Sequence, residues 1–300
     1  MASQSGTRDV LSLKDLHFLT ALARQKHFAR AAEECGVSQP AFSMRIARLE
    51  DQLQTKIVRR GNRFQGLTPD GESLVQHALR IMEDVKKLET EFSTEPGDVT
   101  GVISMGVVPT AAAFAAKMIK RLRDINPGIT VKLMSTTSLN VLQGVEQGEF
   151  DAGITYTEAV EQANLDSVPV HDEEYVLMAP AGMLASDLQE ITWAEAARLP
   201  MCLLEPGMQN RRIIDSVFRE LNCAPRVVAE LSGLTAGVVM AVEGVAATIV
   251  PRGVAEKIAG LDSVDMVALT DPVVRKSLSL VTARRGPGLR TIAALKQAVQ

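Results

Sequence analysis

A break at Glu95-Pro96-Gly97-Asp98 constrains the fold of this chain most, because the pattern of apolar residues differs on its two sides. Before the break, apolar residues recur at i, i+3 and i+4, which is typical of amphipathic helices. After Gly101, short apolar runs alternate with helical segments, as in α/β proteins. A length of 300 residues is enough for two or three domains. We therefore predict a helical head joined at this break to an α/β body.

The charge is distributed unevenly between the two parts. Residues 1–65 hold 11 Lys and Arg against 6 Asp and Glu, whereas the remainder holds 21 against 30. These counts give net charges of +5 for the head and -9 for the rest, which sum to the overall -4. A basic head on an acidic body indicates that only the head meets a polyanion.

Several classes of protein are excluded by what the sequence lacks. It has no run of about 18 apolar residues, and its first 30 residues mix charged with apolar side chains, so we expect a cytoplasmic protein with no membrane partner. Cys35, Cys202 and Cys223 match no disulfide framework or zinc module, and the four His are widely separated. We therefore predict no metal and no cofactor.

The head has the pattern of a helix-turn-helix. Apolar residues predict helices over 13–22 and 28–35, and Gly36 then supplies a tight turn. In the next segment, "VSQPAFSMRIARLE", Ser38 is a good N-cap and Pro40 lies in the first turn, where its missing N–H does no harm. One face of this second helix is apolar and would fill the core of the head: Phe42, Ile46 and Leu49.

A wing and a long helix follow. Residues 56–59 and 64–68 predict two short strands around Gly61-Asn62. Thr68-Pro69-Asp70 then starts a helix. Its apolar residues are spaced alternately by four and three, as in the seam of a short coiled coil: Leu74, Ala78, Ile81, Val85, Leu88 and Phe92. Such a seam needs a partner, so we predict a homodimer.

The second helix of the head is suited to the major groove of double-stranded DNA. Gln39 can pair with adenine, Pro40 can meet a thymine methyl group, and Ser43 can reach a base or a phosphate. From the helix, Arg45 and Arg48 would contact guanine or phosphate. From the wing, Arg60 and Arg63 would contact phosphate or the minor groove. The alternative is a capped surface helix with scattered arginines. The order of cap, turn, wing and dimer helix favours DNA binding.

In the body, we expect mostly parallel sheets covered on both faces and divided into two lobes. The strands are expected at 101–107, 129–135, 151–156, 174–179, 201–204, 226–230, 246–250, 264–268 and 277–282. The helices are expected at 111–124, 139–147, 193–197, 210–221, 234–242, 252–258 and 288–298. Four helices begin after a strand with polar residues at the start, and helix N-termini favour anions. Each alone is more often only an N-cap, but together they favour a ligand site.

The residues just described resemble a known family. "FLTALARQKHFARAAEECGVSQPAFSMRIARLEDQL" followed by "GLTPDGESLVQHA" is similar to the LysR-type transcriptional regulators, which place Ser-Gln-Pro-Ala at the start of the recognition helix. Ser38, Gln39, Pro40 and Ala41 match that motif. Met44 departs from it, because most members carry Arg or Lys there, and here the arginine comes one residue later at Arg45.

This resemblance implies that the chain is divided into domains with different functions. It implies a winged helix-turn-helix at 1–68, a linker helix at 69–95, and a two-lobed α/β module of periplasmic-binding-protein type at 96–300. Lobe I would comprise about 101–160 and 268–300, and lobe II about 161–267. The effector would lie between the lobes and meet hydroxyl and amide side chains, namely Thr110, Thr136, Thr137, Gln209 and Ser232. Thr155 would lie near the hinge of the same site. Arg211 or Arg212 could pair with a second carboxylate, although a solvated arginine is the commoner role.

The function implied is regulation of transcription by a small, anionic effector. Promoter DNA and RNA polymerase would be the macromolecular partners, and dimers would pair into homotetramers. An enzyme is disfavoured because no G-x-S-x-G, H-E-x-x-H, P-loop or G-x-G-x-x-G motif is present. A transport solute-binding protein would leave the first 95 residues unexplained. Peroxide sensing by a thiol is also disfavoured, because Gln209 and Phe218 stand where the peroxide-sensing branch carries its cysteines.

Overall fold

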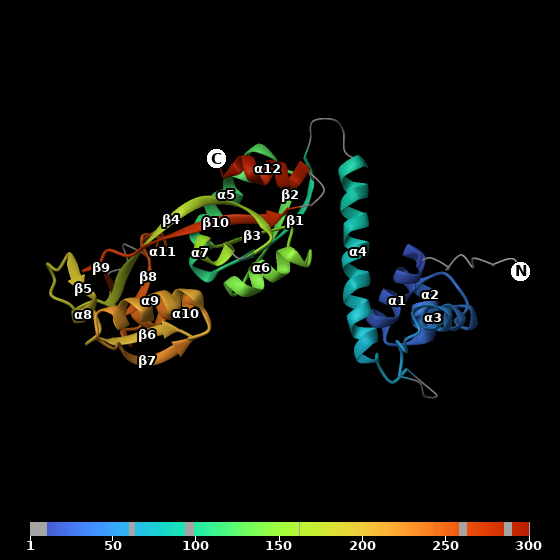
Figure 1. Cartoon of the computed structure of the whole chain (residues 1–300), viewed down its shortest axis with the longest axis horizontal. Helices are drawn as coiled ribbons and strands as arrows, with labels where there is room; N and C mark the ends of the chain where they lie inside the picture. Colours follow the sequence, from blue (N-terminus) through green and yellow to red (C-terminus); the bar gives the residue numbers. More distant parts are fainter. Residues whose placement is uncertain are drawn as a thin grey trace, which may run out of the picture. The chain divides into compact units, whose positions relative to one another are not determined.

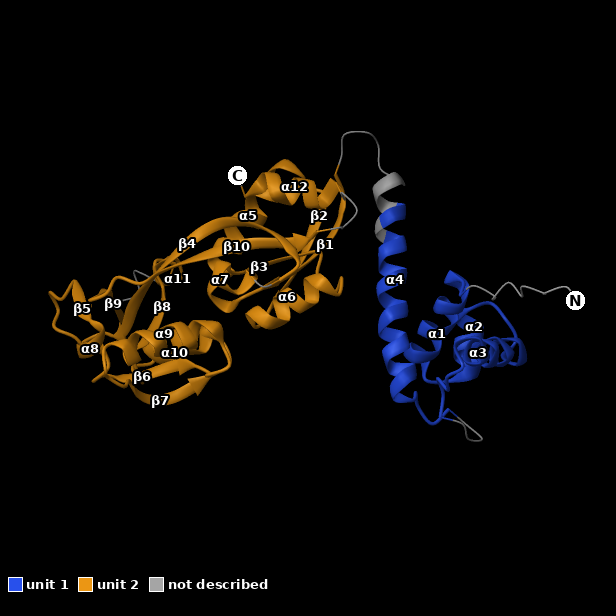
Figure 2. Ribbon diagram, viewed as in Figure 1, with its two compact units in different colours: residues 1–93 blue, residues 94–300 orange. Residues whose placement is uncertain are grey.

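The computed structural model describes residues 11–59, 64–93, 99–161, 163–257, 263–284 and 290–299. The chain separates into two compact units, residues 1–93 and residues 94–300, which are coloured separately in Figure 2. We describe each unit by itself. Among the described residues, no helix is both long and apolar enough to cross a membrane.

Unit 1 is a helical head. Its helices are α1 (Leu13–Gln25), α2 (Phe28–Glu34), α3 (Gln39–Leu53) and α4 (Pro69–Ser93). Ser12 and Asp15 form a reciprocal capping box that begins α1, and Ser38 caps α3 with Pro40 in the first turn, as the sequence predicts. The apolar faces of the helices meet in one core, centred on Leu19, Leu22, Phe42, Ile46 and Leu49.

The wing is anchored to α3 by a buried carboxylate. Glu50 of α3 accepts hydrogen bonds from the backbone N–H groups of Ile57 (2.9 Å) and Val58 (3.1 Å). Val58 then pairs with Leu67 in an antiparallel bridge. This supports the base of the predicted hairpin. The predicted tip, Gly61-Asn62, lies outside the described residues.

A close backbone contact joins the wing to α4. Thr68 donates a hydrogen bond to the carbonyl of Lys56 (2.5 Å) and accepts one from the N–H of Gly71 (3.0 Å). A Cβ atom on Gly71 would lie 2.2 Å from the carbonyl oxygen of Ile57, which is impossible without a backbone shift. Glycine is therefore required where α4 crosses the base of the wing.

The apolar seam of α4 divides into two parts. Ala78 is fully buried in the core of the head, so the prediction that it faces a second chain is wrong. Leu74 is half-buried against the same core, and its contact with a second chain stays a prediction. Further along, Ile81 and Leu88 are 41% and 54% exposed. The sequence pattern could not separate these parts, because both follow the same helical spacing. The side chain of Phe92 lies outside the described residues.

Unit 2 is built on a mixed sheet with the order β2-β1-β3-β10-β4-β9-β5, and β8 also pairs with β4. A second sheet contains β6 and β7. The strands are β1 (Gly101–Val107), β2 (Ile129–Ser135), β3 (Ala152–Tyr156), β4 (Leu165–Pro180), β5 (Glu190–Thr192), β6 (Pro200–Leu204), β7 (Arg226–Leu231), β8 (Thr248–Pro251), β9 (Val264–Thr270) and β10 (Arg275–Ala283). Figure 1 shows β4 and β10 running along the length of this unit.

The helices of unit 2 cover these strands (Figure 1). They are η1 (Pro109–Ala111), α5 (Ala112–Ile125), α6 (Ser138–Glu146), α7 (Thr157–Val160), α8 (Trp193–Ala196), α9 (Gln209–Glu220), α10 (Leu234–Val242), α11 (Arg252–Ala255) and α12 (Arg290–Ala298). α5 and α12 contact each other, and α6 contacts β1, β3 and β10. The largest core surrounds Met105, Ile154, Tyr156, Tyr175 and Trp193.

The prediction of mostly parallel sheets is only half right. β1 pairs in parallel with β2 and β3, and β5–β9 and β6–β7 are also parallel. β10 is antiparallel to β3 and β4, and β4 is antiparallel to β8 and β9. β4 is the reason for the difference, because one strand of 16 residues pairs first with β10 and then with β8 and β9. It thus connects the two halves of the unit.

Candidate functional site

The N-terminal part of α3 presents its polar side to the surface of unit 1. Gln39, Pro40, Met44 and Arg48 are exposed, and Ser43 is half-buried. Met44 is 67% exposed, which is unusual for a large apolar side chain. Ser38 faces its own helix, since its Oγ accepts the N–H of Ala41 at 3.5 Å. The first turns of α3 therefore offer amide, hydroxyl and apolar groups side by side.

Arg45 points the other way, toward α1. Its Nε donates to the carboxylate of Asp15 at 2.8 Å, and its guanidinium lies 5.1 Å from the centre of the Phe18 ring. A second guanidinium nitrogen reaches Ser12 at 3.3 Å. Burial alone would raise the pKa of Asp15, but hydrogen bonds from Ser12 and the charge of Arg45 outweigh it and lower that pKa. Arg45 thus ties α3 to α1, and a contact with DNA stays a prediction.

The two predicted wing arginines, Arg60 and Arg63, lie outside the described residues. The preceding Arg59 is exposed, and its backbone N–H donates to the carbonyl of Gly66 at 3.0 Å.

In unit 2, a small crevice brings together the starts of η1, α6 and α9. Three residues that the sequence predicts for the effector site line it: Thr110, Thr137 and Gln209. Its remaining lining is Val108, Pro109, Ser138, Tyr156, Leu204, Met208 and Asn210. The crevice measures only about 10 Å³, roughly the space of one water molecule. All of these lining side chains are uncharged.

The other three predicted residues lie away from this crevice. Thr136 sits one residue before the α6 cap and accepts a hydrogen bond from Asn140 at 3.0 Å. Thr155 is fully buried in β3, where neighbouring side chains alternate between faces, so it points away from Tyr156. Ser232 is exposed before α10 and does not line the crevice. Thr136, Thr155 and Ser232 do not line this crevice, and their contact with an effector stays a prediction.

Behind the crevice lies a buried hydroxyl network that the sequence did not indicate. The hydroxyl of Tyr156 is 2.9 Å from that of Thr110 and 3.0 Å from that of Tyr175. Burial raises the pKa of both tyrosines, so both stay neutral. Glu173 lies in the same region and is 2% exposed. Burial raises its pKa to about 8, against a smaller lowering effect of the hydroxyls of Thr110 and Tyr156.

Several buried polar atoms here lack a hydrogen-bond partner among the described residues. They are both side-chain polar atoms of Asn210, Ser138 Oγ, Thr155 Oγ1 and Glu173 Oε2. Asn210 and Ser138 line the crevice, at the first turns of α9 and α6. No side chain caps α9, because its N-cap residue is Met208. Buried polar groups usually have partners, so these orphaned atoms favour a bound polar molecule.

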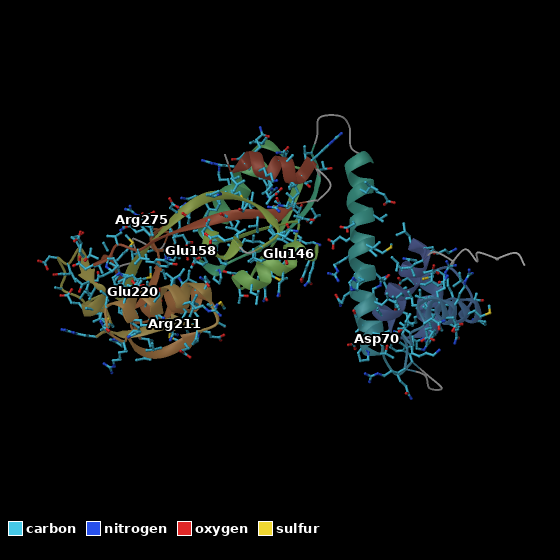
Figure 3. All side chains as sticks on the ribbon, viewed as in Figure 1. Asp70, Glu146, Glu158, Arg211, Glu220 and Arg275 are labelled. Carbon is cyan, nitrogen blue, oxygen red and sulfur yellow. The ribbon has the colours of Figure 1, made fainter. Side chains whose placement is uncertain are left out.

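The arginine and cysteine near the crevice have structural partners. Arg211 (Figure 3) is buried and bonds the carbonyl of Leu204 at 2.8 Å, Asp215 at 2.9 Å and Glu230 at 3.0 Å. It is therefore already neutralised by protein carboxylates. Cys202 is fully buried, and its thiol donates to the carbonyl of Ala247 at 3.4 Å. Burial raises the pKa of this thiol, which makes it a poor nucleophile.

Two sequence families match successive parts of the chain. Residues 13–72 match bacterial regulatory helix-turn-helix proteins of the lysR family, and residues 96–300 match the LysR substrate binding domain. The chain belongs to the LysR family of DNA-binding transcriptional regulators.

Individual relatives agree with this assignment. A hydrogen peroxide-inducible genes activator of Haemophilus influenzae is 31% identical over 192 residues, which is 64% of this chain and 61% of that protein. The match thus spans about three fifths of that LysR relative. The transcriptional regulator BbuR of Bordetella bronchiseptica is 29% identical over 283 residues, covering 93% of this chain and 86% of BbuR.

Solved structures show the same fold over nearly the whole chain. CbnR bound to its target DNA superposes with a TM-score of 0.76 at 20% identity, covering 96% of this chain and 99% of that chain. A full-length OxyR variant of Pseudomonas aeruginosa gives a TM-score of 0.69 at 22% identity, covering 97% of this chain and 98% of that chain. Both are full-length regulators, so the order of head, long helix and α/β unit is the LysR arrangement.

Proposed function

We propose that this LysR-type regulator binds promoter DNA through α3 and that a small organic anion in the crevice changes this binding. The observation that carries the DNA part is the first two turns of α3, where one face fills the head core and the other is exposed. The proposal assigns DNA binding to residues 1–68, dimerisation to 69–95 and effector binding to 96–300. Such a regulator works beside the chromosome, in the cytoplasm.

The exposed face of α3 supports sequence reading at a few positions. Gln39 carries the amide that pairs with adenine, and the neighbouring Pro40 and Met44 offer apolar contact to a thymine methyl group. Ser38 caps the helix and so holds the first turn of α3 in place. With Arg45 held by Asp15, we assign cationic contacts from α3 to Arg48 and from the wing to Arg60 and Arg63.

The crevice supports an anionic effector of small size. Its walls include the start of α9, which no side chain caps, and the orphaned polar atoms of Asn210 and Ser138. Helix N-termini stabilise negative charge, and amide and hydroxyl groups then fix the orientation of the ligand. Since only about 10 Å³ is open, an effector must separate η1 and α6 from α9 to enter. A ligand that favours this wider arrangement shifts the population of states.

The partners beyond DNA and the effector follow from the family and the exposed part of α4. Ile81 and Leu88 offer an apolar stripe to a second copy of the chain, which gives a homodimer. Pairing of two dimers into a homotetramer and contact with RNA polymerase complete the proposal.

The DNA part is tested by selection from a random double-stranded library with the full-length protein. The preferred site is then titrated by fluorescence anisotropy. Replacing Gln39 with Ala is expected to weaken binding to that site by about 1–3 kcal/mol and to relax the preference at one base pair. Gln76→Ala, on the exposed side of α4, is the matched control and should bind as the parent does. Failure to enrich any sequence above non-specific binding would refute the proposal.

The effector part is tested by a thermal-shift screen of organic anions, because binding to the folded state raises the melting temperature. Ser138→Ala and Asn210→Ala should abolish the shift caused by a positive compound. Thr155→Val is the control, since Thr155 is buried away from the crevice and should leave the shift unchanged. A shift that survives both crevice variants would place the effector elsewhere.

A further inference from the structure

A larger groove lies in unit 2 beside the crevice and holds about 560 Å³, within the usual range for small-molecule sites. One wall is α5, from Ala113 to Arg121, and the other is the start of α11 at Arg252 and Gly253. Residues 171–174 of β4 lie between them. The groove shares Thr110 with the crevice, but its other lining residues are different.

Glu173 gives this groove one carboxylate oxygen that lacks a partner among the described residues. It lines the groove, and its Oε2 is buried with no hydrogen bond to any described residue. The next residue is a contrast, because Glu174 accepts from Arg252 at 2.8 Å and from Arg275 at 3.0 Å. With a pKa raised to about 8 by burial, Glu173 is neutral near pH 7 and offers both an O–H donor and an acceptor.

The α5 wall adds positive charge. Lys117 and Arg121 are one helical turn apart, exposed, and line the groove. Neither has an ion pair or hydrogen bond with a described residue, whereas Lys120 between them pairs with Asp124 at 3.0 Å. These two cations are therefore available to one anionic group.

Phe114 and His171 give the groove a flat wall. The rings of Phe114 and His171 stack with centroids 5.1 Å apart and an angle of 9° between their planes. Burial, and then the nearby charge of Lys117, lower the pKa of His171, so this ring stays neutral near pH 7. The groove thus has two available cations on α5, a flat neutral wall and a buried hydrogen-bonding acid, and its lining also includes the carboxylates of Asp172, Glu174 and Glu256.

We propose that this groove is a second ligand site, for a small hydroxycarboxylate whose carboxylate meets Lys117 and Arg121 and whose hydroxyl meets Glu173. This site is separate from the proposed effector crevice and does not depend on it. Its walls come from α5, which contacts β2 and α12, and from α11, which contacts β4 and β8. A molecule in the groove therefore contacts both halves of unit 2.

The proposal is tested by isothermal titration of citrate and malate into the full-length protein at pH 7, with inorganic phosphate for comparison. At least one hydroxycarboxylate should bind more tightly than phosphate. The double variant Lys117→Gln, Arg121→Gln should weaken that binding about tenfold or more, which corresponds to losing one charge-assisted contact. Arg123→Gln, an exposed cation on α5 that does not line the groove, is the matched control and should change nothing.

Glu173 variants separate this site from simple attraction of anions. Glu173→Gln resembles the neutral acid and should bind within about threefold of the parent, whereas Glu173→Leu should bind about tenfold more weakly. If Glu173→Leu does not fold, as judged by circular dichroism, the surface double variant still decides the question. Binding of neither citrate nor malate, equal binding of phosphate, or an unchanged affinity in the double variant would each overturn the proposal. Loss in Ser138→Ala alone would assign the ligand to the crevice and overturn it as well.

Discussion

At the scale of single residues, Glu173 and Glu174 show how two adjacent carboxylates acquire opposite behaviour. Burial raises the pKa of Glu173 to about 8, although hydrogen bonds with the hydroxyls of Thr110 and Tyr156 lower it in part. Hydrogen bonds from Arg252 and Arg275 lower the pKa of Glu174. Between pH 4.5 and 8 the folded state keeps the Glu173 proton that the unfolded state has released, so this residue costs stability as pH rises.

We therefore expect Glu173→Gln to stabilise the protein at pH 9, on the order of a few kcal/mol, and to have little effect at pH 4. Glu174→Gln should destabilise the protein at pH 9 and have a smaller effect at pH 4. The lowered pKa of Glu174 provides stability above its unfolded pKa, and this stability is lost as pH falls. Urea unfolding of the full-length variants at both pH values measures this. An equal effect of Glu173→Gln at pH 4 and pH 9 would contradict the argument.

Arg45 carries a second prediction at this scale. Removing it leaves the nearly buried carboxylate of Asp15 without its guanidinium partner, so Arg45→Ala should destabilise the head by about 1–3 kcal/mol. Met44→Ala, the exposed neighbour on α3, should stay within about 0.5 kcal/mol of the parent. A double-mutant cycle with Asp15→Asn isolates the pair. Additive losses in that cycle would show that the contact does not contribute.

These residues also show where sequence reasoning ends. The cap at Ser38 and the apolar face of Phe42, Ile46 and Leu49 follow from local spacing, and the structure has both. The partner of Arg45 is 30 residues away, so no local pattern reveals it. Glu173 stands in a run of charged residues that is typical of an exposed segment, yet it is 2% exposed and lies near the hydroxyls of Thr110 and Tyr156.

At the scale of elements, most helices and strands were predicted close to their observed bounds, and the exceptions have physical causes. The first half of β4, which contains Pro169 and His171–Glu173, was missed because its proline and charges are unfavourable in an isolated strand. Pairing with β10 along its length compensates for them. β5 and α7, of three and four residues, are too short to show a periodicity.

α4 supports a prediction about assembly. Ile81 and Leu88 differ by seven residues and lie on one side of the helix, whereas the exposed Leu79 lies on the opposite side. Ile81→Lys and Leu88→Lys should each weaken self-association about tenfold or more, since burying such a side chain is worth about 1.5–3 kcal/mol. Leu79→Lys should leave it unchanged.

Sedimentation velocity over a concentration series measures these changes. Ala78→Lys separates the two parts of α4, because Ala78 is fully buried in the head core and its replacement should unfold the head. If Leu79→Lys dissociates the protein while Leu88→Lys does not, the dimer uses the other face of α4.

At the scale of the whole molecule, the family order of head, long helix and α/β unit could be predicted from the sequence, because it is read from local motifs in succession. Three of the six residues predicted for the effector site line the crevice. Thr110, Thr137 and Gln209 follow strands and begin helices, and that rule found them. Thr155 lies within β3, where side chains alternate between faces and Tyr156 takes the crevice side, and Ser232 is exposed before α10 without lining the crevice.

Coupling between the crevice and DNA binding gives the last prediction. A ligand changes DNA affinity only if it favours one arrangement of unit 2, so a compound can raise the melting temperature and still not regulate. For an effector found by thermal shift, Ser138→Ala should abolish both the shift and the change in DNA affinity. Its DNA affinity without effector should stay within about twofold of the parent, because Ser138 lies in a different unit from α3.

Anisotropy titrations of operator DNA, with and without the compound, decide this in the same preparation. Reciprocity supplies an internal check, since DNA must change the affinity for the effector by the same factor as the effector changes the affinity for DNA. If Ser138→Ala weakened DNA binding in the absence of any compound, the crevice would act on DNA binding without a ligand. The effector would then not be the source of the coupling.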